Sequence, residues 1–421
     1  MMNFGFIREV GGKDERIVVG LDVGSTKICT VVGEFSIEPD GGPVNVIGVG
    51  TAPSKGIRKG IITNIENMAE SIRVAVRQAE STAGVEIKAV HIGITGGHIE
   101  CFSSSGVIAV REKEIGRKEV DSVIDAAKAV AIPFDREMLH VIPVGFTVNG
   151  QDGISDPRGM QGVRLETDVR IITGAATSVQ NLIRSCRRAG LEVMEVIFQP
   201  LASAEAVLTE DEKELGVAVV DIGGGTTDIA IFREGGICHS SVLAVGGGNF
   251  TNDIAIGLRM PAREAEDVKK KHGCTMISMA GEGEHIETES GGGKPGRSMP
   301  RRYLVEILQP RAEELFTLIR EEIREFHSDM NSGVVLTGGA ALMEGMDVMA
   351  ENILELPVRI GSPAGIDSVT EEIYGPAYAT AAGLALIGAE EYRMEYRPHS
   401  GRALTSITAR MREWVGDVFR F

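Results

Sequence analysis

Two stretches of the chain repeat the same order of apolar and polar positions. In 17–27 and in 217–228, a run of apolar, largely β-branched residues is followed by an aspartate and then by a turn of Gly, Ser and Thr. Strand-like composition resumes after each turn, at 27–32 and 228–232. Apolar runs bounded by Gly-rich turns are typical of buried strands. We therefore predict two β-hairpins, each with a Gly-rich turn at its tip.

Both Gly-rich turns have the composition of a phosphate-binding loop. Backbone N–H groups bind phosphate where small residues allow close approach, and hydroxyl side chains add further donors. One such turn alone is more often an ordinary tight turn. Two copies facing each other would hold the phosphates of a nucleotide from both sides, and Asp22 and Asp221 at the strand ends would suit a hydrated Mg²⁺.

A third apolar strand also ends in glycines. Residues 334–342 read VVLTGGAAL, and Gly338 and Gly339 would let a purine or ribose lie against the backbone; a plain strand-to-helix turn is the alternative. Two Gly/Ala-rich helices are predicted at 200–207 and 377–384. Their small residues permit the close crossing that a hinge between two halves requires, although ordinary helix packing explains them as well.

The same periodicities predict several further elements. Apolar spacing predicts helices over 117–130 and 303–326, the second with a kink or boundary at Pro310. Low-complexity sequence at 281–300 is best interpreted as a surface loop or hairpin. Further strands are predicted at 99–110, 138–149 and 163–173.

The last residues of the chain differ in character from the rest. From Leu404 onward, apolar positions alternate in spacings of three and four, which predicts an amphipathic helix over 404–421. Arginines at the edges of the apolar face, and the chain's single tryptophan on it, are typical of a helix in a membrane interface. A terminal helix docked on the body is the alternative. The residues expected at the membrane are Leu404, Ile407, Arg410, Met411, Arg412, Trp414, Val415, Val418, Phe419 and Phe421.

Composition and charge narrow the classes of function. The chain has 421 residues, 43% of them hydrophobic, and a formal charge of −17; this indicates a folded, acidic protein with two or more compact units. The negative charge argues against a nucleic-acid partner. Five scattered cysteines without a CxxC pair favour reduced thiols in the cytoplasm. We find no signal peptide and no apolar stretch long enough to span a bilayer.

The order of the two phosphate loops, two connecting helices and adenosine loop resembles the actin-like ATPases. Within that superfamily, the sequence is similar to the FtsA family of bacterial division proteins over nearly the whole chain. The segments that carry the resemblance are 45–66, 139–146, 208–231, 265–274 and 334–346.

This resemblance implies an α/β fold of the duplicated actin-like (ribonuclease H-like) kind, with two lobes, an inserted subdomain called 1C and a C-terminal amphipathic helix. On this pattern the chain divides into subdomain 1A (14–98 and 179–212), subdomain 1C (99–178), subdomain 2A (213–256 and 331–390), subdomain 2B (257–330), a linker (391–403) and a membrane-targeting helix (404–421).

The resemblance also implies which residues contact ATP and Mg²⁺. The first phosphate loop is matched by Asp22, Gly24, Ser25, Thr26 and Lys27. The second is matched by Asp221, Gly223, Gly224, Gly225, Thr226 and Thr227. Positions near the ribose, adenine and adenosine are matched by Glu266, Lys269, Gly338 and Gly339. For Glu266 and Lys269, a solvated helix face is the alternative.

Asp22 and Asp221 would hold Mg²⁺ through water, and Lys27 would contribute charge to the β- and γ-phosphates. Gln199 matches the position of a residue that orients the attacking water in hydrolysing relatives. Glutamine can position water but is not a base, so we expect ATP hydrolysis to be slow if it occurs.

Members of the FtsA family polymerise and tether the tubulin-like protein FtsZ to the cytoplasmic face of the cell's inner membrane at the division site. The resemblance implies that the acidic C-terminal tail of FtsZ binds subdomain 2B, where Arg297, Arg301 and Arg302 cluster, and that subdomain 1C receives other division proteins. Anionic membrane surface is the expected partner of the C-terminal helix.

Three other classes share the fold. A small-molecule kinase and a PilM-type pilus-assembly protein would not be expected to carry the amphipathic tail. A chaperone ATPase would need a large peptide-binding region after residue 390, which the remaining residues are too few to form.

Overall fold

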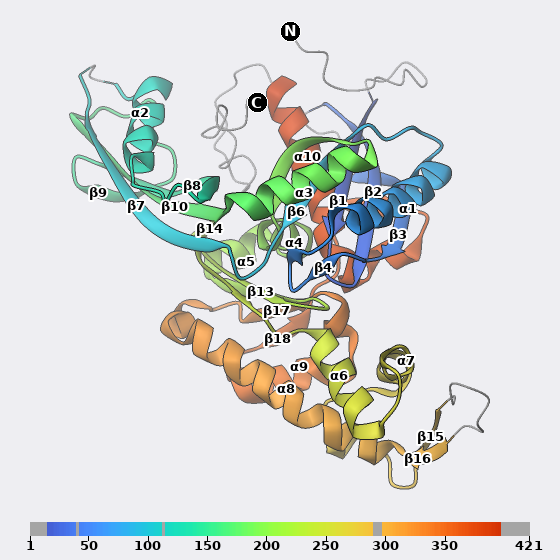
Figure 1. Ribbon diagram of the computed structural model, residues 1–421. Helices are drawn as coiled ribbons and strands as arrows, with labels where there is room; N and C mark the ends of the chain where they lie inside the picture. The colour runs from blue at the N-terminus through green and yellow to red at the C-terminus, as the bar shows by residue number, and fades with distance from the viewer. Residues whose placement is uncertain (1–14, 39–41, 112–113, 289–296, 397–421) are drawn as a thin grey trace.

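The computed structural model describes residues 15–38, 42–111, 114–288 and 297–396. Figure 1 shows two lobes, each built on a β-sheet, and a smaller sheet that projects from the first lobe. The predicted membrane helix and residues 397–403 of the predicted linker lie outside the described residues. Within the described part of the chain, no helix is both long and apolar enough to cross a membrane.

The first lobe contains a mixed six-stranded sheet. Its strands are, in order, β11 (Glu192–Phe198), β6 (Ala89–Ile94), β1 (Glu15–Val23), β2 (Lys27–Ser36), β3 (Val44–Pro53) and β19 (Ile366–Ser368). Helix α1 (Ile65–Ala83) packs on β3, and its first turn is capped by the side chain of Asn64. Gly50 permits this packing, because a Cβ there would lie 2.0 Å from the Ala75 carbonyl oxygen. The remaining short elements of this lobe are α3 (Ala176–Ala189), β4 (Ile57–Arg58) and β5 (Ile61–Ile62).

The second lobe repeats this arrangement around a five-stranded sheet. Its strands are, in order, β14 (Gly236–Leu243), β13 (Thr227–Arg233), β12 (Val217–Ile222), β17 (Val334–Thr337) and β18 (Val358–Ile360). In each lobe, a hairpin (β1–β2 or β12–β13) has a parallel strand (β6 or β17) beside its first strand. Both predicted hairpins are confirmed, and the shared topology shows that the fold is duplicated.

Four helices belong to the second lobe, and they lie below its sheet in Figure 1: α6 (Gly247–Leu258), α7 (Ala262–His272), α8 (Arg301–Ile323) and α9 (Met346–Leu354). Between α7 and α8 the strands β15 (His285–Thr288) and β16 (Arg297–Pro300) form a hairpin. A kink or a boundary is predicted at Pro310; a boundary is wrong, because α8 continues through this residue. Leu308 and Ala312 are fully buried on either side, so packing outweighs the hydrogen bond that proline lacks.

The inserted sheet projects at the upper left of Figure 1. Its strands, in order, are β7 (Glu100–Ala109), β10 (Arg164–Ala175), β8 (Arg136–Val148) and β9 (Gln151–Ile154), and α2 (Arg117–Lys128) packs on β7 and β10. These elements confirm the three predicted strands and the predicted helix of this region. Strand β14 of the second lobe contacts β7 and β8, so the insertion touches both lobes.

Two helices join the lobes. Helix α4 (Gln199–Val207) runs from the first sheet to the short α5 (Glu210–Leu215) that precedes β12, and α10 (Ala379–Tyr396) packs across α4 and β1. Strand β19 pairs with β3 and α10 lies on the first-lobe sheet, so these two elements of the predicted subdomain 2A contact the first lobe. The small apolar residues of α10 are buried on more than one side of the helix, because the helix packs against both α4 and β1 where the two lobes meet.

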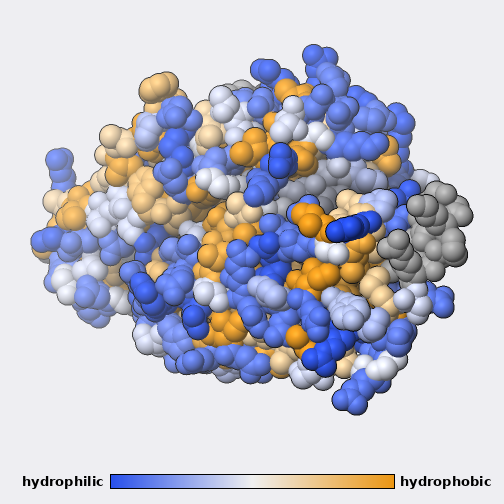
Figure 2. Space-filling model, turned by 60° about the horizontal axis from the view of Figure 1, so that its bottom comes forward, coloured by the Kyte–Doolittle hydropathy of each residue, from blue (hydrophilic) through white to orange (hydrophobic). Residues whose placement is uncertain are grey.

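Viewed from the side on which α8 and the β15–β16 hairpin lie, the surface mixes hydrophilic and hydrophobic patches (Figure 2). Exposed apolar side chains on the helices of this region include Ile256 and Tyr303.

Candidate functional site

A cavity of about 1280 Å³ lies between the two lobes. It is lined by both Gly-rich turns, the glycines after β17, the start of α4 and the side of α7. With one exception, all of the residues predicted to contact nucleotide line this cavity. The exception is Thr227, which is fully buried and donates its hydroxyl hydrogen bond to the Val245 carbonyl oxygen at 2.8 Å.

The two Gly-rich turns have the same local geometry and touch each other. In the first, the Gly24 amide donates to the Lys27 carbonyl oxygen at 3.1 Å; in the second, the Gly223 amide donates to that of Thr226 at 3.0 Å. A Cβ at Gly224 would lie 2.3 Å from the Thr26 methyl carbon. Glycine is therefore required where the turns of the two lobes meet.

Three aspartates line the cavity: Asp221 and Asp228 are buried, and Asp22 is half-buried. Burial raises the pKa of Asp22 to about 7, against the opposing effect of Lys27, and burial raises the pKa of Asp221 as well. The third, Asp228, follows the second turn, and its pKa is raised to about 8 by burial and by the charge of Asp221. Sequence reasoning missed Asp228, which pairs with Asp221 across the second hairpin; the matching position opposite Asp22 in the first hairpin is Cys29.

The donor set fits a hydrated Mg²⁺ better than a directly ligated metal. In the described residues, no group of three or more His, Cys, Asp or Glu side chains is arranged to hold a metal ion. Mg²⁺ commonly keeps several waters and binds through one or two carboxylates together with substrate phosphates. Asp22 and Asp221 at the cavity wall supply such carboxylates.

Each aspartate receives hydrogen bonds from neutral donors on other elements. The Gln199 Nε2 group donates to Asp22 Oδ1 at 2.9 Å, and the Thr95 hydroxyl donates to Asp228 Oδ1. The side chains that bond to Asp221 lie on α4 and α10.

The Lys27 side chain reaches from β2 to the 3-10 turn Pro376–Tyr378, which precedes α10. Its Nζ donates to the Ala377 carbonyl oxygen at 2.8 Å and lies 3.8 Å from the centroid of the Tyr378 ring. The Lys27 side chain therefore connects the first turn to residues 376–378, whose Pro376 carbonyl oxygen accepts from the Gly338 amide.

The wall of the cavity formed by α6 and α7 holds a compact polar cluster. Lys269 Nζ donates to the Gly247 carbonyl oxygen, the Thr251 hydroxyl and the Glu266 carboxylate at 2.9, 2.8 and 2.7 Å. Burial acts to raise the pKa of Glu266, but hydrogen bonds from Lys269 and Thr251 outweigh it and lower that pKa. The two predicted residues therefore form an ordered pair at the cavity, not a solvated helix face.

The glycines after β17 bring the backbone close to the second aspartate. Gly338 has a φ of 86°, in the left-handed region, and a Cβ there would lie 2.3 Å from Asp221 Oδ1. After Gly338 the chain makes a 3-10 turn at Gly339–Leu342 before α9.

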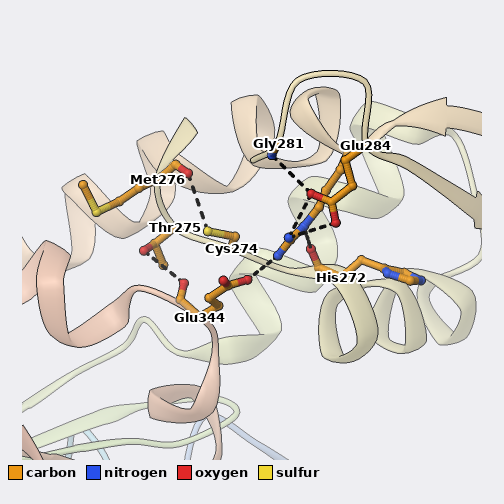
Figure 3. A network of polar contacts seen from close by, with 8 residues as sticks. His272, Cys274, Thr275, Met276, Gly281, Glu284 and Glu344 are labelled. Carbon is orange, nitrogen blue, oxygen red and sulfur yellow. Dashed lines mark hydrogen bonds and ion pairs between the residues drawn. The ribbon is translucent and has the colours of Figure 1, made fainter. Parts of the chain in front are cut away.

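The three arginines predicted to bind a partner have different environments. Arg301 is only 12% exposed and its guanidinium group pairs with Glu284 at 3.2 Å and with Glu344. Figure 3 shows both carboxylates pointing toward this one guanidinium group, beside the His272 carbonyl oxygen that accepts from Arg301 Nε at 2.9 Å. Arg302 is 63% exposed and pairs with Glu306 along α8. The side chain of Arg297 lies outside the described part of the structure.

Comparison with known proteins places this geometry in a family. A family model described as "Cell division protein FtsA" matches residues 218–383, and one described as "SHS2 domain inserted in FTSA" matches residues 96–173. The FtsA proteins of Pseudomonas aeruginosa and Escherichia coli K12 are 43% and 38% identical to this chain, over 89% and 96% of it and over 90% and 99% of their own lengths. FtsA of Bacillus subtilis is 38% identical, over 91% of this chain and 86% of its own.

Solved structures of lower identity share the fold. The PilM–PilN type IV pilus biogenesis complex matches with a TM-score of 0.64 at 18% identity, over 88% of this chain and 98% of that chain. MreB5 of Spiroplasma citri bound to ADP matches with a TM-score of 0.55 at 15% identity, over 91% and 99%. With its two duplicated lobes, its inserted domain and relatives that align over nearly its whole length, the chain belongs to the FtsA family of cell division proteins and has the actin-like fold.

Proposed function

We propose that this protein binds ATP with Mg²⁺ in the cleft between its lobes and tethers FtsZ to the cytoplasmic face of the cell membrane at the division site. The observation that carries the nucleotide site is the pair of touching Gly-rich turns, one from each lobe, beside three aspartates that line the cavity. The solved relative bound to ADP supports a nucleotide in a cleft of this fold.

The described contacts support a role for each wall of the cleft. Backbone amides and hydroxyls of the two turns would bind the phosphates, and Asp22 and Asp221 would hold Mg²⁺ through water. Glu266 and Lys269 would contact the ribose and adenine, with Gly338 and Gly339 against the adenosine. When bound, Mg²⁺ would neutralise phosphate charge.

Hydrolysis of ATP is expected to be slow. Gln199 matches the position of a residue that orients the attacking water, and its amide already donates to Asp22 at 2.9 Å. Nucleotide binding would therefore serve mainly to hold the two lobes together. By fixing their arrangement, it would also stabilise a polymer of this chain.

The proposed attachment to membrane and partners is supported by sequence and family. The apolar pattern of 404–421 suits an anionic membrane surface, and the second-lobe helices would receive the FtsZ tail near exposed Arg302. Other division proteins would bind the inserted sheet. A kinase or a PilM-type role has only the shared fold in its favour, whereas full-length FtsA relatives are 38–43% identical.

Equilibrium binding of a fluorescent ATP analogue tests the nucleotide site. Asp221→Ala removes a contact to hydrated Mg²⁺ and Gly224→Val forces a side chain between the turns, so we expect each to weaken binding at least about tenfold. Gly97→Val is the matched control, because a Cβ at Gly97 meets nothing within 4 Å. Unchanged affinity in both folded cleft variants would contradict the proposed site.

A further inference from the structure

Helices α4 and α10 cross at very short range beside the second aspartate. A Cβ at Gly383 of α10 would lie 1.7 Å from the Ala202 carbonyl oxygen of α4, so only glycine fits at this crossing. Close to this crossing, Ser203 of α4 and Thr380 of α10 lie side by side. The side chain of Asp221, near the end of β12, reaches the same place.

Two hydroxyl groups at the crossing bind the same carboxylate oxygen. Ser203 of α4 donates to Asp221 Oδ2 at 2.7 Å, and Thr380 of α10 donates to that oxygen at 3.0 Å. The two hydroxyl oxygens are 3.0 Å apart. Ser203 is fully buried and Thr380 is 8% exposed, so water does not replace these donors.

The other oxygen of Asp221 has different surroundings. Oδ1 faces the backbone of Gly338, where an added Cβ would lie 2.3 Å from it. No hydrogen bond to Oδ1 is found among the described residues. With Oδ2 held by two donors, the carboxylate cannot rotate freely, and Oδ1 remains for a water of the metal.

Helix α4 also contacts the aspartate of the first lobe. Gln199, four residues before Ser203, donates to Asp22 Oδ1 at 2.9 Å. Residues four apart lie on one face of a helix. One face of α4 therefore spans the aspartates of both lobes, and α10 completes the contact with the second.

We propose that Ser203 and Thr380 are positioning residues for the Mg²⁺–nucleotide complex: they orient Asp221 and thereby couple occupancy of the cleft to the crossing of α4 and α10. The inference rests on the proposed nucleotide site and assigns it two residues, one on each helix that joins the lobes. A metal-bound Asp221 and an intact crossing stabilise each other, because the same two hydrogen bonds serve both.

The test compares nucleotide affinity with Mg²⁺ and with EDTA. Ser203→Ala, Thr380→Val and the double variant are titrated with a fluorescent ATP analogue under both conditions. We expect the affinity gained from Mg²⁺ to fall about three- to tenfold in each single variant and further in the double, with Mg²⁺-free affinity unchanged. Thr380→Ser, which keeps the hydroxyl, should restore the gain.

Ser185→Ala is the matched control, because Ser185 is equally buried but donates to the Asn181 carbonyl oxygen within α3. Hydrogen exchange gives a second readout: Mg²⁺–nucleotide should slow exchange of α4 and α10 amides in the natural protein and much less in the double variant. Thr380→Val keeps the side-chain volume, so it decides the question if the double variant does not fold.

Each result decides between the alternatives. The positioning role would be overturned if Mg²⁺ still increased nucleotide affinity to the same extent in folded Thr380→Val. It would also be overturned if the substitutions lowered nucleotide affinity equally with and without Mg²⁺. Either result would leave the nucleotide site intact. If the natural protein binds no nucleotide, the proposed function itself fails, and the positioning role fails with it.

Discussion

Asp228 illustrates the cost of burying an acid in the cleft. Its side chain is buried, and its pKa is raised from 3.8 to about 8 by burial and by neighbouring Asp221. An unfolded chain releases this proton near pH 4, whereas the folded chain retains it until about pH 8. The folded state therefore binds more protons over this interval, and Asp228 lowers stability progressively as the pH rises through it.

Asp228→Asn should consequently stabilise the nucleotide-free protein, and more so at pH 8 than at pH 5. Asparagine keeps an acceptor for the Thr95 hydroxyl but cannot ionise. We expect the melting temperature to rise by about 2–4 °C at pH 8. Asp168→Asn is the control, because Asp168 also accepts from a hydroxyl, that of Ser105, but is exposed. If Asp228→Asn raised the melting temperature equally at pH 5 and pH 8, ionisation of Asp228 would not be the cause.

At the scale of elements, Arg301 joins parts of the chain that are far apart in sequence. Its guanidinium group links the start of α8 to the end of α7, to Glu284 before β15 and to Glu344 before α9. Glu344 and Arg301 also line the cavity proposed to bind nucleotide. These ion pairs therefore connect the partner-binding region proposed for the second lobe to the wall of this cavity.

Charge reversal should separate the roles of Arg301 and Arg302. Arg301→Glu would leave Glu284 and Glu344 facing a third carboxylate, so we expect a lower melting temperature and weaker nucleotide binding. Arg302→Glu alters an exposed side chain, and should leave stability unchanged while weakening binding of an acidic FtsZ-tail peptide severalfold at low salt. Titrating both variants with the peptide at two salt concentrations tests this expectation. If neither Arg302→Glu nor salt changed the peptide affinity, the FtsZ tail would bind elsewhere on the protein.

The whole molecule combines an acidic body with a basic C-terminal end. From Tyr392 to Phe421 there are six arginines against three carboxylates, in a chain whose formal charge is −17. Each basic residue near an anionic surface contributes about 1 kcal/mol. Attachment through this segment would thus depend on anionic lipid, and a polymer presenting many such segments would bind more tightly than a single chain.

Trp414, the only tryptophan, would report on the proposed attachment. Vesicles containing anionic lipid should shift its emission to the blue as the side chain enters the acyl boundary. Trp414→Glu removes the fluorescent reporter, so its vesicle binding is measured by co-sedimentation, and we expect this substitution to abolish it. Ala409→Glu adds the same charge on the opposite side of the predicted helix and should not abolish binding. An emission maximum unmoved by excess vesicles would mean that the segment packs on the body.

Local sequence was enough to determine the hairpins, the Gly-rich turns and most residues of the cleft. Each depends on near neighbours: an apolar run forms a buried strand, and a glycine turn with hydroxyls suits phosphate whatever surrounds it. That is why Asp22 and Asp221, at the ends of two such runs, could be assigned from the pattern alone. The repeat then indicated a duplicated fold.

Tertiary structure alone decided which distant groups meet. The return of β19 and α10 to the first sheet, the pairing of Arg301 with Glu284 and Glu344, and the two hydroxyls on Asp221 all join residues tens to hundreds of positions apart. Ser203 and Thr380 look like ordinary small residues of packed helices in the sequence. Their role becomes visible only because a crossing close enough to require Gly383 brings both to one buried carboxylate.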